Sequence, residues 1–217
     1  TVCLNGQPLF EDLKMLLNRP LRIANDANCF ALSEALDGAG KGYGIVFGVI
    51  MGTGVGGGIV INGQLCPGRQ HICGEWGHNI LEVDGPDCYC GQKGCVETLI
   101  SGPGLAGDFY RSGGNPVLTA SDIALQAAQG NSVAEVTMQR FFDRFGRALA
   151  TVVNILDPDV IVLGGGLSKI ERLYSEGREK VAQYVFNDQL ITPILQNLHG
   201  DSSGVRGAAQ LWEVSEL

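Results

Sequence analysis

The stretch Ile45–Ile61 reads IVFGVIMGTGVGGGIVI and carries the strongest local signals for the fold. Its first part, Ile45–Met51, is apolar and rich in β-branched side chains, which predicts a buried strand. A second apolar run, Ile59–Ile61, precedes Asn62-Gly63, a dipeptide typical of tight hairpin turns. The glycine-rich segment Gly52–Gly58 is therefore expected to join two strands, without leading into a helix.

This glycine-rich segment is a candidate phosphate-binding loop. The spacing of Gly52, Gly54 and Gly57 matches the G-x-G-x-x-G pattern, but dinucleotide-binding loops of that pattern open a helix. The segment does offer bare backbone N–H groups and one hydroxyl, which suit phosphate oxygens. A glycine-rich hairpin without a ligand explains it equally well. The candidate residues are Gly52, Thr53, Gly54, Val55, Gly56, Gly57 and Gly58.

Residues 64–97 follow the second strand, show no clear periodicity and hold a dense group of metal-ligand side chains. These are one imidazole and three thiols, from His78, Cys88, Cys90 and Cys95. Such a set completes a tetrahedral Zn²⁺ site, and a site with no open position is structural. A disulfide or unused thiols would be the alternative. We predict a structural zinc that holds loop 75–97.

Two carboxylates, Glu75 and Glu97, bracket the metal-ligand group. A zinc ion would fix the loop and therefore the orientation of both side chains. Carboxylates held in this way can accept hydrogen bonds from sugar hydroxyls. The alternative is that both are simply solvated.

Upstream of the strands, helical spacing over residues 9–17 precedes a short predicted strand, Leu21–Ala24. Asn25-Asp26 then opens a helix that ends at Gly38. Asp26 would point from the carboxyl edge of a sheet, where ligands of α/β proteins bind. A carboxylate in this position suits the base that takes a hydroxyl proton in phosphoryl transfer. A helix-capping role explains Asp26 equally well.

Downstream, residues 133–156 have the best helical period in the chain, and Pro158 ends that helix. The buried strand Val160–Leu163 follows, and the glycine run Gly164, Gly165 and Gly166 then turns into a helix at 169–186. Backbone N–H groups at a helix start suit a nucleotide, although a tight turn alone is the preferred explanation of this run.

The remaining elements complete an alternating pattern. We expect a short helix at 119–129, a strand near Ile194 and a last helix at 205–214. Strands that alternate with helices indicate an α/β domain.

Composition excludes several classes of protein. A formal net charge of -8 argues against nucleic acid as a partner, because phosphate backbones require a basic face. The sequence has neither a membrane-spanning apolar run nor a signal-peptide pattern, so we expect a cytoplasmic location. With no secretory signal, the 7 cysteines favour free or metal-bound thiols over disulfides.

Together these motifs resemble the ROK family of sugar kinases and related repressors. The motifs on which this resemblance rests span most of the chain. They are Asn25-Asp26-Ala27-Asn28, Gly52–Gly58, Gly74-Glu75-Trp76-Gly77-His78, Cys88–Glu97, Asp157–Gly166 and His199–Ala209. Within the family, the contexts Ile23–Cys29 and His199–Ala209 resemble bacterial fructokinases and mannokinases most, and N-acetylglucosamine kinases next.

The resemblance implies an actin-like ATPase (ribonuclease H-like) lobe with an inserted zinc-binding loop, which binds a hexose and ATP with Mg²⁺. Asp26 would be the catalytic base, Gly52–Gly58 would hold phosphates, and Gly164–Gly166 would lie by the adenosine. His78 would use one ring nitrogen for zinc and the other for a sugar hydroxyl. The implied sugar-binding residues are Asn25, Glu75, His78 and Glu97. A homodimer is typical of the family.

One departure concerns the family's N-terminal phosphate loop, Asp-x-Gly-Gly-Thr-Lys, which this sequence lacks. We therefore expect residues 1–24 to be a remnant of the N-terminal lobe and residues 25–217 to form the sugar- and nucleotide-binding lobe. The chain alone is then not expected to be fully active.

The expected function is an ATP-dependent hexose kinase that phosphorylates the 6-hydroxyl of fructose or mannose. The alternatives are an N-acetylglucosamine kinase, a sugar-sensing regulator of the same family, and a zinc-binding structural domain without a small-molecule site.

Overall fold

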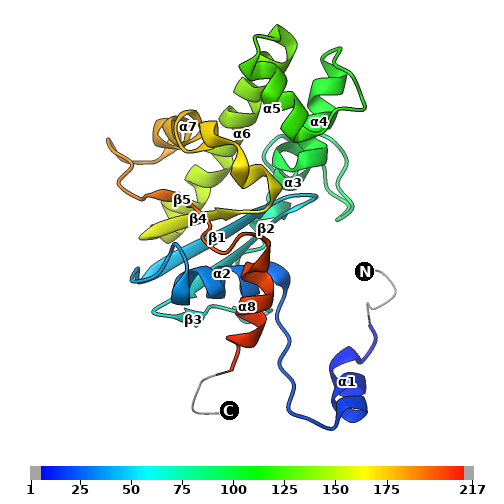
Figure 1. Ribbon diagram of the computed structural model, residues 1–217, viewed down its shortest axis with the longest axis vertical. Helices are drawn as coiled ribbons and strands as arrows, with labels where there is room; N and C mark the ends of the chain where they lie inside the picture. Colours follow the sequence, from blue (N-terminus) through cyan, green and yellow to red (C-terminus); the bar gives the residue numbers. More distant parts are fainter. Residues whose placement is uncertain (1–5, 213–217) are drawn as a thin grey trace.

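A five-stranded sheet in the order β3-β2-β1-β4-β5 organises the chain (Figure 1). The computed structural model describes residues 6–212. Its strands are β1 (Ile45–Met51), β2 (Val55–Ile61), β3 (Gln64–Leu65), β4 (Val160–Gly164) and β5 (Ile194–Gln196). β1 is antiparallel to β2 and parallel to β4, and β4 is parallel to β5. The predicted α/β class is confirmed.

Helices cover both faces of this sheet (Figure 1). The α-helices are α1 (Leu9–Leu17), α2 (Asp26–Asp37), α3 (Val96–Ile100), α4 (Gly102–Arg111), α5 (Ala120–Ala128), α6 (Ser132–Leu156), α7 (Glu176–Tyr184) and α8 (Ser203–Ala209). α2 and α8 lie below the sheet in Figure 1, and α3 to α7 lie above it. The described part of the chain contains no helix that is both long and apolar enough to cross a bilayer.

The two faces of the sheet have separate hydrophobic cores because side chains alternate along a strand. On β1, Phe47 and Val49 enter the larger core, under α6, whereas Val46 enters the smaller one, against α2. β4 repeats the pattern, with Ile161 in the larger core and Val162 in the smaller. The sheet is therefore buried on both sides, as the continuous apolar runs of these strands predict.

The loop within the glycine-rich segment is shorter than expected. β1 and β2 pair from Ile45↔Ile61 to Met51↔Val55, so only Gly52–Gly54 form the turn. The remaining glycines lie in β2, where they allow close packing. A Cβ on Gly58 would lie 2.7 Å from the Ala27 carbonyl oxygen, so α2 could not approach the strand.

Several predicted helices form where expected. α5 begins with a capping box between Thr119 and Asp122, and the predicted helix 133–156 is α6. The Asn131 side chain caps α6, which ends at Asp157 in a left-handed conformation, directly before Pro158. α1 matches the predicted helix 9–17, but none of its residues is buried, and it stands apart from the sheet in Figure 1.

Other predictions were wrong. Residues 21–24 have no regular secondary structure and pair with no strand among residues 6–212, and Ile23 is 52% exposed. The helix expected at 169–186 begins only at Glu176, because the 3-10 turns η3 (Gly166–Lys169) and η4 (Glu171–Leu173) come first. α8 ends at Ala209, short of the predicted 214, a position that lies outside the described residues. α3 and α4 were not predicted.

Candidate functional site

A cavity of about 700 Å³ opens where the start of α2, the β1–β2 turn and the segment before α3 meet. Its lining includes each of the residues predicted for catalysis and sugar binding: Asp26, Asn25, Glu75, His78 and Glu97. The other lining residues are Ala27, Ile50, Gly52, Thr53, Gly54, Val55, Gly56 and Tyr89. Segments distant in sequence thus contribute to one site, with three carboxylates, Asp26, Glu75 and Glu97, in the same lining as the glycine turn.

The first turn of α2 separates the roles of Asn25 and Asp26. The Asn25 Oδ1 accepts a hydrogen bond of 2.7 Å from the Asn28 backbone N–H and so caps the helix. The Asn25 Nδ2 donates to Glu75 Oε1 over 3.0 Å. Asp26 does not cap the helix: its Oδ1 accepts from the Ala27 N–H at 2.9 Å, and no described residue bonds its Oδ2. The Asp26 carboxylate is exposed and lines the cavity, so it can accept a proton from a hydroxyl bound there.

Glu97 has a structural contact that the sequence did not indicate. It lies in the first turn of α3 and accepts a 2.9 Å hydrogen bond from the Val55 N–H through its Oε2. A Cβ on Gly54 would lie 2.4 Å from that oxygen, so a side chain there would displace the Glu97 carboxylate. Glu97 therefore links α3 to the glycine turn at the edge of the cavity.

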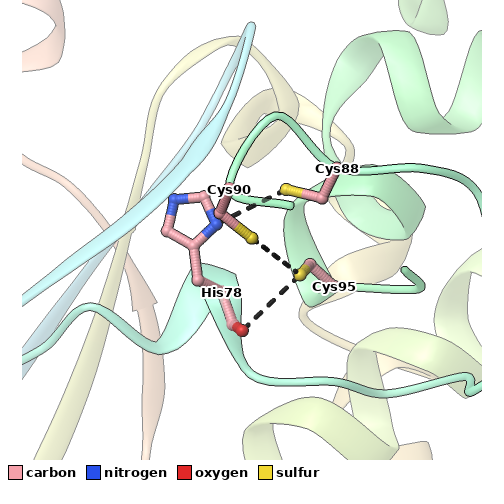
Figure 2. Close-up of side chains that lie close together, drawn as sticks. All are labelled: His78, Cys88, Cys90 and Cys95. Carbon is pink, nitrogen blue, oxygen red and sulfur yellow. Dashed lines mark hydrogen bonds between the residues drawn. The ribbon is translucent and has the colours of Figure 1, made fainter. Parts of the chain in front are cut away.

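The predicted metal ligands come together beside the cavity. The ligand atoms of His78, Cys88, Cys90 and Cys95 all lie within 4.8 Å of one another. Figure 2 shows the three sulfurs and the imidazole of His78 gathered at one point. The Cys90 and Cys95 Sγ atoms are 3.6 Å apart, and the His78 Nδ1 lies 3.6 Å from the Cys88 Sγ. Zn–S bonds of about 2.3 Å in a tetrahedron place sulfurs about 3.8 Å apart, so this donor set fits zinc.

A bound metal ion would explain how the buried thiol of Cys95 can ionise. Burial, followed by the neighbouring thiols Cys90 and Cys88, raises the pKa of Cys95 to about 12. The Cys95 thiol would therefore be difficult to ionise without a cation. A bound divalent ion stabilises the thiolates and so removes this cost.

The two ring nitrogens of His78 face different surroundings. The Nδ1 lies toward the thiols, whereas the Nε2 is 3.0 Å from the Tyr89 hydroxyl. The Tyr89 ring packs edge-on against the imidazole, with centroids 5.1 Å apart, yet Tyr89 is 84% exposed. Partial desolvation of its hydroxyl, followed by the charge of Glu97, raises the pKa of Tyr89 above its usual value. The sequence analysis missed this residue, although its place between two metal ligands is a signal.

A second anchor holds the loop. Glu82, within the loop, accepts hydrogen bonds from Arg144 at 2.8 Å and Arg147 at 3.0 Å, both on α6. Burial opposes ionisation, but the two guanidinium groups hold the pKa of Glu82 below its usual value. Gly94 lies against it in a left-handed conformation (φ 61), where a Cβ would meet the Glu82 carbonyl oxygen at 1.5 Å. The sequence analysis did not single out Glu82.

A neighbouring cavity of about 380 Å³ shares Gly52 and Thr53 with the first. Gly166 lines it, as predicted for the nucleotide side, together with residues that the sequence analysis missed. These are Gly102, Pro103, Ala106, Thr119, Ala120, Ser121 and Leu167. The glycine turn therefore lies between two adjoining hollows, an arrangement suited to two ligands that exchange a group across it.

Four predicted nucleotide-site glycines line neither of these two cavities. Gly57 and Gly58 lie within β2, and Gly164 is the last residue of β4. A Cβ on Gly164 would lie 2.4 Å from the Phe30 ring, and one on Gly165 would lie 2.4 Å from the Met51 carbonyl oxygen. These glycines allow close packing, and the contact with ligands expected for them stays a prediction.

Known proteins resemble this chain along nearly its whole length. The model of the ROK family matches residues 2–215. The N-acetyl-D-glucosamine kinase of Yersinia pseudotuberculosis serotype O:1b (strain IP 31758) is 42% identical, over 95% of this chain and 71% of the relative.

Solved structures agree with the sequence comparison. A ROK family glucokinase from Streptomyces griseus, in complex with glucose and AMPPNP, superposes with a TM-score of 0.83 at 29% identity, over 94% of this chain and 72% of that one. A ROK family transcriptional regulator, a homolog of the E. coli MLC protein, has a TM-score of 0.80 at 26% identity, over 92% and 53%.

Proposed function

Because the chain belongs to the ROK family, we propose that the larger cavity is the active site of an ATP-dependent sugar kinase. The predicted resemblance to this family is confirmed, and the solved relatives show that the α/β fold is of the actin-like ATPase kind. The observation that carries the proposal is the convergence of Asp26, Glu75, His78 and Glu97 on one cavity beside the glycine turn.

The proposed reaction assigns a role to each group at this cavity. Asp26 accepts the proton of a sugar hydroxyl while that oxygen attacks the γ-phosphorus of ATP. The bond from the γ-phosphorus to the bridging oxygen breaks, and ADP leaves. Asn25, Glu75, His78 and Glu97 orient the sugar, since amides, carboxylates and imidazoles suit hydroxyl groups. Mg²⁺ would enter with the phosphates and offset their charge.

The phosphates are proposed to cross the turn between the two cavities. Gly52 and Thr53 line both hollows, so their backbone lies where the transferred group must pass. The smaller cavity, which Leu167 and Pro103 line, offers apolar surface to the adenine ring. The nucleotide role of this turn thus rests on fewer glycines than the sequence analysis expected.

N-acetylglucosamine is the substrate that we favour. The relative from Yersinia pseudotuberculosis described above is named an N-acetyl-D-glucosamine kinase, and it is 42% identical to this chain. The first expectation, fructose or mannose, has less support than the alternative. A cytoplasmic homodimer that does not bind nucleic acid remains our expectation.

A zinc ion on His78, Cys88, Cys90 and Cys95 is proposed to brace the sugar side of this cavity. The ion would hold the imidazole through Nδ1 and leave Nε2 for a hydroxyl, because the two nitrogens already face opposite ways. Purified protein that lacks zinc while these three thiols remain reduced would contradict the assignment.

The decisive experiment compares the full-length protein with its Asp26→Asn variant. We expect ATP turnover to be highest with N-acetylglucosamine in a panel that includes glucose, mannose and fructose. The variant should lose roughly 10²–10⁴-fold in kcat, the usual contribution of a general base. Calorimetry should show that it still binds the sugar. Turnover that survives the substitution would remove Asp26 from this role.

A sugar-sensing regulator is the second candidate, because a ROK transcriptional regulator shares the fold. The same experiment separates the two functions. Sugar binding by the wild-type protein without any ATP turnover favours the regulator. Absence of both would favour a zinc-braced structural domain.

A further inference from the structure

Cys66 and Cys73 form a close pair of thiols outside the metal-ligand group. Their Sγ atoms lie 3.4 Å apart, and both residues are free and partly exposed. We propose that this pair is a dithiol modification site, which reacts with small-molecule disulfides to form a reversible Cys66–Cys73 disulfide. Disulfide sulfurs lie about 2.0 Å apart, so modest side-chain rotations would close the remaining gap.

The backbone between the two cysteines holds them in this relation. The Cys66 N–H donates to the Ile59 carbonyl over 2.9 Å and so continues the pairing of β3 with β2. The Cys73 N–H donates to the Pro67 carbonyl over 3.3 Å, which closes the intervening segment into a loop. Gly68 has φ +70, and a Cβ placed on it would lie 3.2 Å from the Cys73 Cβ. The loop geometry therefore brings the two sulfurs together.

The chemistry balances with one added reactant, a disulfide such as oxidised glutathione. One protein thiolate attacks a glutathione sulfur, breaks its S–S bond and releases one glutathione thiolate. The second protein thiolate attacks the mixed disulfide and releases the other, so two protons pass to the two glutathione thiolates. Burial, then the bond to Cys66, raises the pKa of Cys73 to about 11, so we expect the exchange to accelerate with pH.

Oxidation at this site would affect a segment next to the larger cavity. Only Gly74 separates Cys73 from Glu75, and a Cβ on Gly74 would lie 2.6 Å from the Gly57 carbonyl oxygen. The residues that lead to Glu75 are therefore already packed on β2. A Cys66–Cys73 bond would tie them to β3 as well.

The other cysteines of the described residues are poorer partners for such an oxidant. Cys29 is buried, at 5% exposure, and Cys88, Cys90 and Cys95 belong to the metal-ligand group. Thiolates that coordinate zinc are held by the metal, and zinc-loaded protein should keep them out of the reaction. Oxidised glutathione should therefore react selectively with Cys66 and Cys73.

The test uses zinc-loaded protein treated with increasing oxidised glutathione, then alkylated and digested with trypsin without reduction. Trypsin cuts after Arg69, between the two cysteines, so a disulfide leaves the two peptides joined. We expect joined peptides, loss of two hydrogens from the intact mass, unchanged zinc content, and reversal by dithiothreitol.

Cys66→Ser and Cys73→Ser are the matched controls, and each should accumulate a stable glutathione adduct on the remaining cysteine of the pair. If these variants fold poorly, the alkylation pattern of the wild-type protein alone shows whether Cys66 and Cys73 form the disulfide. Two thiols that stay fully alkylated at every glutathione concentration, or a bond formed first among Cys88, Cys90 and Cys95, would overturn the proposal.

Discussion

The Tyr89 hydroxyl lies 3.0 Å from the His78 Nε2, the ring nitrogen that faces away from the thiols. A sugar hydroxyl that binds this nitrogen must first displace Tyr89. We therefore predict that Tyr89→Phe, which removes only the hydroxyl, lowers KM for the sugar and leaves kcat unchanged. A competing hydrogen bond of about 1 kcal/mol corresponds to roughly a fivefold change in KM. Steady-state kinetics over a range of sugar concentrations measure both constants.

Tyr110→Phe provides the matched control, because Tyr110 is also exposed, at 59%, but lies on α4. It should leave both constants unchanged. A higher KM in Tyr89→Phe would show that this hydroxyl binds the sugar itself, which contradicts competition.

Among the structural elements, the zinc-binding loop is held by its metal-ligand group and by the ion pairs of Glu82. Glycine at position 94 leaves room for both attachments. An alanine there would place its Cβ 1.5 Å from the Glu82 carbonyl oxygen, in a backbone with φ +61. We predict that Gly94→Ala unfolds more easily, by about 3 kcal/mol, and retains less zinc. The estimate combines left-handed strain of about 1 kcal/mol with overpacking of about 2 kcal/mol. Denaturant unfolding and metal analysis are the measurements.

Gly91→Ala is the control that separates the cost of a left-handed backbone from the cost of a steric clash. Gly91 also has a left-handed backbone (φ +91), but a Cβ there meets nothing within 4 Å. This variant should lose only about 1 kcal/mol, the cost of the left-handed conformation. Equal losses in the two variants would mean that the contact between Gly94 and Glu82 is unimportant.

The ion pairs of Glu82 make the attachment of this loop to α6 dependent on pH. Arg144 and Arg147 hold the pKa of the folded Glu82 below its unfolded value. The stabilisation is thus present above the unfolded pKa, about 4.3, and is lost as pH falls through the folded pKa. We predict that Glu82→Gln costs about 2 kcal/mol at neutral pH and that the difference from wild type shrinks below pH ~4.

Unfolding of both proteins across this pH range provides the test, and comparing them cancels the loss of zinc that they share. Lys93→Gln is the control: it removes an ion pair with Asp87 whose side chains are 64% and 83% exposed, so its effect should be small. A difference between Glu82→Gln and wild type that stays constant with pH would contradict the prediction.

Considered as a whole, the molecule was predictable where the determinants are local. The apolar period of α6 is a property of adjacent turns, and the metal ligands from His78 to Cys95 are close in sequence. Leu21–Ala24 has strand-like residues, but a strand also needs a neighbour, which no sequence window shows. The ion pairs of Glu82 involve arginines that are over sixty residues away in the sequence. Its role in holding the loop can be recognised only when α6 is placed beside the loop.

The assembly of the whole chain also depends on the contact between α8 and α2, the helix whose first residue is Asp26. A Cβ on Gly207 would lie 1.7 Å from the Cys29 carbonyl oxygen, whereas one on Gly204, also in α8, meets nothing within 4 Å. We predict that Gly207→Ala destabilises the protein by about 3 kcal/mol and lowers turnover, because α8 must move away from α2.

Gly204→Ala should be neutral or stabilise by about 0.5–1 kcal/mol, since alanine favours the helix over glycine. Thermal and denaturant unfolding of the two variants, with ATP turnover measured at a temperature where both are folded, decide the matter. Equal stability of the two would show that α8 is not a tightly packed part of the fold. A destabilised Gly207→Ala with normal turnover would show that α8 supports the fold without positioning Asp26.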